Sequence, residues 1–183
     1  IQSELNNIGL ALTNDYKLEK YIKHLKADIL EYDFSEKYFD NIVSWLALYH
    51  ISERPKLLKK LYYLLKKDGY FYTEDFFLNS SIKEKDKKIL SQSFHANHLV
   101  EYEIYLKELK DSGFKILEAT DLSKDWKQFT KNRFFDYKKN IKKYLEIHDA
   151  TTVKNVLKFY ELAYKLLLEK RIGGIRYICS KKL

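Results

Sequence analysis

The sequence has 183 residues, 45% of them hydrophobic, which is enough apolar material for one folded domain with an ordinary core. No apolar run approaches the ~18–20 residues that a membrane-spanning helix needs, and the opening residues, IQSELNN, do not form a secretory signal. A single cysteine, Cys179, excludes an internal disulfide framework and favours the cytoplasm.

The net charge of +8 comes from 34 basic and 26 acidic residues and would suit an anionic partner such as nucleic acid. The lysines are spread through every segment, however, and only four residues are arginines. Because bases are read mainly by arginine, nucleic-acid binding is not expected, and a lysine-rich proteome explains the charge as well. The oligomeric state is left open.

In the first half of the chain, a lysine-rich helix lies between two short apolar runs. The expected elements are a helix over 2–12, an extended segment over 21–27 that ends at Asp28, a strand over 39–45, a helix, and a strand over 70–76. The second helix is expected to begin at Ser52, with Pro55 in its first turn, and to end at Gly69 in a left-handed cap. This order indicates a parallel sheet, which presents ligand-binding residues at the carboxyl ends of its strands.

The second half alternates in the same way and adds a long helical insertion. Residues 79–94 are polar and read as helical or mobile. The further expected elements are a helix over 101–110, a strand over 114–122, helices over 124–146 and 151–170, and a last strand over 174–180. The last strand is entered through Gly173 and Gly174. The insertion, about 124–170, is expected to cover one edge or face of the sheet.

Four local patterns, in this order and spacing, resemble the class I S-adenosylmethionine-dependent methyltransferases. They are Ala27-Asp28-Ile29, the strand FDNIVS with the LYH that soon follows it, the turn LKKDG with the strand that ends at Asp75, and the LKDSGF and DLSKDW segments. The sequence is most similar to small-molecule N-methyltransferases that act on phosphoethanolamine, glycine or sarcosine. The resemblance implies an α/β, Rossmann-like sheet, mostly parallel with an antiparallel last strand, helices on both faces, and a helical insertion before the last strand.

The resemblance also implies S-adenosylmethionine as the cofactor. Asp28 would accept a hydrogen bond from the adenine amino group, Ile29 and Leu46 would enclose the adenine, and Trp45 would also contact the cofactor. From the residues alone, Asp28 can equally cap a turn, and the apolar residues can be plain core. Leu46 stands where the phosphoethanolamine enzymes carry an aspartate, which puts that particular activity in doubt.

Methyl transfer requires a base to take a proton from the attacking atom, and His50 is the candidate. The alternative is a structural histidine that anchors its loop. The substrate-binding residues that we expect are Tyr49, Asp75, His98, Tyr105 and Arg176. His95 and His98 are three residues apart, but no cysteine or acidic set completes a metal site, so no metal is expected.

One motif of the family does not occur in the sequence. The chain has five glycines and no Gly-x-Gly, whereas the family places a glycine-rich loop after its first strand. We therefore expect residues 1–183 to be a single methyltransferase-like domain without its first strands. The alternatives are a catalytically inactive methyltransferase-like domain that serves in binding or scaffolding, and, more weakly, a basic RNA-associated methyltransferase.

Overall fold

The computed structural model describes residues 3–34, 38–79 and 82–181. The chain divides into two compact units, Ile1–Ser35 and Glu36–Leu183, each of which is described by itself. None of the helices in the described residues is long and apolar enough to cross a membrane.

The first unit consists of one helix, α1 (Ser3–Asp15), and a series of turns. The helix lies against His24, whose Nε2 is 2.7 Å from the hydroxyl of Thr13. A Cβ atom at Gly9 would be 2.9 Å from the His24 ring, so glycine permits this close approach. The predicted helix is confirmed. Residues 21–27, expected to be extended, are not paired with any strand of the described sheet, and the amides of Tyr21 and Ile22 bond instead to the carbonyl oxygen of Leu18 in a turn.

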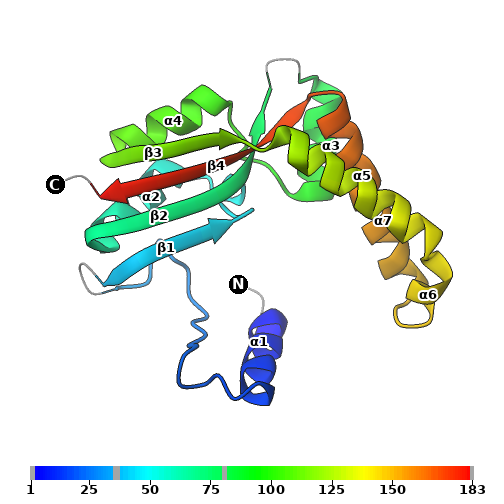
Figure 1. The fold of residues 1–183 in the computed structure, drawn as a ribbon, viewed down its shortest axis with the longest axis horizontal. Helices are drawn as coiled ribbons and strands as arrows, with labels where there is room; N and C mark the ends of the chain where they lie inside the picture. Colours follow the sequence, from blue (N-terminus) through cyan, green and yellow to red (C-terminus); the bar gives the residue numbers. More distant parts are fainter. Residues whose placement is uncertain (1–2, 35–37, 80–81, 182–183) are drawn as a thin grey trace. The chain divides into compact units, whose positions relative to one another are not determined.

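The second unit is built on a four-stranded sheet (Figure 1). The strands, in spatial order, are β1 (Phe39–Trp45), β2 (Leu65–Leu78), β4 (Ile172–Lys181) and β3 (Phe114–Asp121). β1 and β2 are parallel, whereas β4 is antiparallel to both of its neighbours. The predicted fold class, including the antiparallel last strand, is confirmed.

The helices of this unit follow the predicted order. They are the short 3-10 helix η1 (Leu48–His50), α2 (Arg54–Leu64), α3 (Glu84–Phe94), α4 (Tyr102–Asp111), α5 (Ser123–Lys139), α6 (Ile141–Leu145) and α7 (Ala150–Leu168). α2 and α4 cover one face of the sheet and are joined by the Arg54–Glu108 ion pair. On the opposite face Val43 and Tyr70 are about half exposed, and Trp126 of α5 packs against Gly174 where β4 begins.

The boundary between α2 and β2 differs from the prediction. The helix ends at Leu64 and the strand begins at once, and the left-handed residue is Asp68 (φ 63°) rather than Gly69. The glycine is needed for another reason, since a Cβ there would be 2.8 Å from the carbonyl oxygen of Asp40. The predicted cap at Ser52 is also wrong, because Glu53 holds that position and no side chain caps the helix.

The predicted insertion is a pair of long helices, α5 and α7, packed side by side and joined through α6. Figure 1 shows it projecting beyond the carboxyl end of β1 rather than lying over a face of the sheet. It is held where β4 begins, because Trp126 of α5 lies on Gly174, at which a Cβ would be 2.5 Å from the indole ring. The insertion is thereby fixed beside the strand ends.

Candidate functional site

The site begins where β1 ends. Trp45 is the last residue of the strand, and Leu46 adopts a left-handed conformation (φ 50°) while its amide donates a 2.9 Å hydrogen bond to the carbonyl oxygen of Glu74. Such a conformation is costly for a side chain of this size and tends to occur at functional sites. It turns the chain away from the sheet and into η1, which carries His50.

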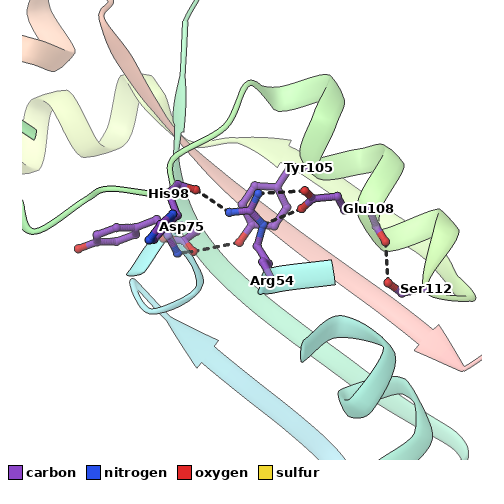
Figure 2. Close-up of polar contacts among 7 residues, drawn as sticks. Arg54, Asp75, His98, Tyr105, Glu108 and Ser112 are labelled. Carbon is purple, nitrogen blue, oxygen red and sulfur yellow. Dashed lines mark hydrogen bonds and ion pairs between the residues drawn. The ribbon is translucent and has the colours of Figure 1, made fainter. Parts of the chain in front are cut away.

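A buried carboxylate anchors that turn (Figure 2). Asp75, fully buried in β2, accepts hydrogen bonds at Oδ2 from the Tyr49 amide (3.1 Å) and the Tyr105 hydroxyl (3.0 Å). Its Oδ1 accepts a third, from the Phe76 amide at 3.0 Å. Burial raises the pKa of Asp75 to about 6, although these hydrogen bonds oppose the shift.

His50 is exposed, and its Nδ1 lies 3.1 Å from the carbonyl oxygen of His95. Since a carbonyl can only accept, the proton of this hydrogen bond is on Nδ1. In the neutral ring, Nε2 then carries the lone pair and can act as a base. His50 therefore combines an anchored loop position with a nitrogen that can take a proton.

Arg54 holds the neighbouring loop in place (Figure 2). Its guanidinium donates to both carboxylate oxygens of Glu108, at 2.6 and 3.1 Å, and to the carbonyl oxygen of His98 at 2.7 Å. It also lies over the ring of Tyr105, 5.0 Å from the centroid. Because the His98 amide donates to the Tyr49 carbonyl at 3.2 Å, the loop is tied to the turn that bears His50.

A cavity of about 530 Å³ opens between the strand ends and the α5–α7 pair. Its lining residues are Trp45, Leu46, Glu74, Phe76, Asp125, Trp126, Phe129, Thr130, Phe159, Tyr160 and Ala163. The ring of Phe76 meets that of Trp126 edge-on at 4.9 Å and that of Tyr49 at 5.8 Å. The wall of the cavity is therefore continuous with the turn that carries His50.

The structure brings some of the predicted residues to this cavity and places others elsewhere. Trp45 and Leu46 line it. Asp75 and Tyr105 lie inside the protein, bonded to one another, rather than in a pocket. Arg176 is engaged by the hydroxyl of Tyr72 (2.9 Å) and by Glu74 (2.8 Å).

Tyr49 is buried in the turn, and His98 is exposed while its backbone makes the contacts described above. Asp28 and Ile29 belong to the first unit. There Asp28 Oδ1 accepts the Leu30 amide at 2.8 Å, which is the turn-capping role, and Ile29 is exposed. Among the described residues, no group of three or more histidine, cysteine or acidic side chains could hold a metal ion.

The sequence prediction missed two sets of residues. Arg54 and Glu108 were not expected, although Arg54 precedes Leu57, Leu58 and Leu61 by three, four and seven residues, which places it on the apolar face of its helix. Of the cavity residues on α5 and α7, Asp125 and Trp126 belong to the DLSKDW segment, whereas the others carry no such signal, because only the folded chain brings them to the strand ends.

The open α/β sheet, with its antiparallel last strand, matches a Rossmann-like methyltransferase fold. A sequence model of a family described as methyltransferase domain matches residues 4–73. A search of curated proteins found no match.

Solved structures share the fold. A protein of Galdieria sulphuraria, provisionally named a sarcosine dimethylglycine methyltransferase, matches all of this chain with a TM-score of 0.85 at 15% identity, over 68% of its own length. Phosphoethanolamine N-methyltransferase 2 of Haemonchus contortus, in complex with S-adenosyl-L-methionine, matches 95% of the chain with a TM-score of 0.81 at 17% identity. The chain spans 41% of that protein.

The cyclase SpnF also matches the whole chain, with a TM-score of 0.73 at 14% identity, and the chain spans 64% of it. The predicted resemblance to S-adenosylmethionine-dependent methyltransferases is confirmed by the domain match and the shared fold.

Proposed function

We propose that this protein is an S-adenosylmethionine-dependent methyltransferase that acts on the amine nitrogen of a small polar acceptor. The observation that carries the proposal is the position of His50. It stands just past the carboxyl end of β1, with Nε2 available as a base, in a fold shared with enzymes of this class. The cytoplasm is the proposed compartment, because the one cysteine, Cys179, is a buried free thiol.

The residues at the strand ends are suited to bind the apolar parts of the cofactor. Trp45 and Leu46 are 67% and 43% exposed and offer apolar surface suited to an adenine or a thioether. Asp28, considered by itself within the first unit, is exposed and uses Oδ1 for its turn, so Oδ2 can accept a hydrogen bond. When bound, the cofactor supplies a methyl group activated by its sulfonium.

The protein's own part in the reaction is to position the amine and to remove its proton. An ammonium cannot attack carbon until it loses a proton, and His50 Nε2 is the group that would take it. Asp75 and Arg54 support this step indirectly. Asp75 holds the Tyr49 amide in the turn from which His50 projects, and Arg54 holds the His98 carbonyl in the neighbouring loop that is tied to this turn.

Replacing His50 tests this assignment. We expect His50→Ala to lower methyl transfer from radiolabelled cofactor by ~10²–10⁴-fold, with cofactor affinity nearly unchanged. His148→Ala is the matched control, since it removes an imidazole from the exposed α6–α7 connection. Unchanged turnover in His50→Ala would remove the histidine from the mechanism.

A second candidate is a methyltransferase-like domain that does not transfer methyl groups. It is favoured by the lack of any Gly-x-Gly in the sequence and by the presence of the same fold in a protein named as a cyclase. Cofactor binding without transfer to any of a broad panel of amines would support this candidate over the first.

A further inference from the structure

The cavity at the strand ends has a composition that indicates its ligand. We infer that it binds an amine with an apolar body, either aromatic or branched aliphatic, and with the ammonium group directed at Glu74 and Asp125. The inference rests on the proposed function only in treating this ligand as the methyl acceptor, and it narrows the small polar acceptor proposed above to one whose polar group is the amine alone. The binding itself can be measured without turnover.

Aromatic rings supply most of the lining. Six of the lining residues are aromatic, and three of these are left substantially exposed: Trp45 at 67%, Phe129 at 58% and Phe159 at 39%. Large apolar side chains gathered and exposed around one concavity mark a binding surface, since burying them elsewhere would have been favourable. Rings in this arrangement can pack against an apolar body and can also attract a cation through their faces.

The charged groups of the lining are both acidic. Glu74 and Asp125 are present, but no lysine or arginine is among the lining residues, although the chain has 34 basic residues and a net charge of +8. An acidic, aromatic cavity in so basic a chain is the complement of a cation. A phosphate or carboxylate would meet two carboxylates there, and the guanidinium of Arg176 beside them is already paired with Glu74.

Glu74 keeps one oxygen available for this purpose. Among the described residues, the Tyr72 hydroxyl and the Arg176 guanidinium both bind its carboxylate at Oε1. These contacts hold the side chain in one orientation and leave Oε2 to accept from an ammonium group. Asp125 also lines the cavity and is exposed in the first turn of α5.

Other polar groups of the lining do not favour an anion. The hydroxyl of Thr130 donates within its own helix, to the carbonyl oxygens of Trp126 at 2.8 Å and Lys127 at 3.2 Å. Arg176 is bound to Glu74 and would have to leave it to reach an anionic ligand. Phosphorylated amines are therefore expected to be rejected here.

Tryptophan fluorescence reports on this cavity directly, because the chain has two tryptophans and both line it. We would titrate the full-length protein with 2-phenylethylamine, with 2-phenylethanol as the uncharged match, and with phosphoethanolamine. The expected result is a saturable change with the amine, binding of the alcohol ~10-fold weaker, and no saturable change with phosphoethanolamine. Phosphoethanolamine that binds as well as phenylethylamine would overturn the inference.

Charge variants locate the ammonium group. Glu74→Gln and Asp125→Asn should each weaken the amine several-fold and leave the alcohol unchanged, whereas Glu161→Gln, on α7 outside the lining, should affect neither ligand. Asp125→Asn keeps the test decisive if Glu74→Gln, which loses an ion pair, does not fold. Equal amine affinity in Asp125→Asn and the unaltered protein would refute the proposed orientation.

Variants that remove an aromatic ring test where the apolar body of the ligand binds. Phe129→Ala should weaken both the amine and the alcohol, and Phe135→Ala, which removes a similarly exposed ring of the same helix outside the lining, should weaken neither. Cofactor binding is measured on the same samples. Amine binding without cofactor binding would contradict the proposed function alone, and cofactor binding without amine binding would contradict this inference alone.

Discussion

The Arg54–Glu108 pair offers a test of how the loop around His50 is held. Replacing Arg54 by methionine keeps much of the side-chain volume but removes both hydrogen bonds to Glu108 and the one to the His98 carbonyl. The carboxylate of Glu108 would then remain in a largely desolvated place without its partner. The carbonyl of His98 would lose its donor at the same time.

The loss of stability expected for Arg54→Met follows from the burial of both members of the ion pair. The side chain of Arg54 is 4% exposed and that of Glu108 is 17% exposed. Removing one member of a buried ion pair costs about 3–5 kcal/mol, mostly because the other charge stays buried and unpaired. A domain of this kind has a total stability of about 5–15 kcal/mol, so Arg54→Met should be strongly destabilised but measurable.

Urea unfolding, followed by circular dichroism, measures the effect. The double variant Arg54→Met with Glu108→Leu should recover much of the loss, since replacing a buried pair by apolar residues is often neutral. Lys107→Met is the matched control. It breaks an exposed ion pair with Asp111 on the same helix and should leave the unfolding midpoint unchanged. A loss below about 1 kcal/mol in Arg54→Met, or a double variant less stable than the single one, would refute the reasoning.

Three further predictions concern single buried groups. Burial raises the pKa of Asp75 to about 6, so the native state binds this proton more tightly than the unfolded chain does. The protonated Asp75 contributes its whole share of the free energy of unfolding below pH ~4, and this share, on the order of 2–3 kcal/mol, is lost as the pH rises through 6. The urea midpoint of unfolding should therefore fall across this pH range, and Asp75→Asn should make the fall smaller. Burial likewise raises the pKa of the Cys179 thiol to about 12, so iodoacetamide should modify it only in denaturant, and rapid labelling of the native protein would contradict its burial. Gly174→Ala would place a Cβ 2.5 Å from the Trp126 ring, so we expect a lower unfolding midpoint and altered cavity fluorescence, and an unchanged spectrum would refute this packing.

The sequence predicts much of the fold because its elements have strong local signals. The runs that become β1 and β3 are compact, β-branched or aromatic, and bounded by turn residues, and the structure places both strands where they were expected. The end of α2 was predicted wrongly. The KKDG turn resembles a helix stop, but here it belongs to a strand whose Gly69 packs against the Asp40 carbonyl.

The site was less predictable because its contacts join distant segments. His50 could be singled out from its place after an apolar strand, but its hydrogen bond to the His95 carbonyl spans 45 residues. Asp75 was recognised by its position at the end of a strand, whereas its burial beneath Tyr105 depends on how α4 packs. The aromatic wall of the cavity could not be foreseen, since it depends on where the α5–α7 pair is placed against β4.

Cofactor binding tests most directly whether this fold and the residues at its strand ends serve S-adenosylmethionine chemistry. Isothermal titration of the full-length protein with S-adenosylmethionine measures it. We predict saturable binding with one site per chain, weakened by Trp45→Ala and unaffected by the control His148→Ala. A folded protein that produces no binding heat with S-adenosylmethionine would contradict the central claim.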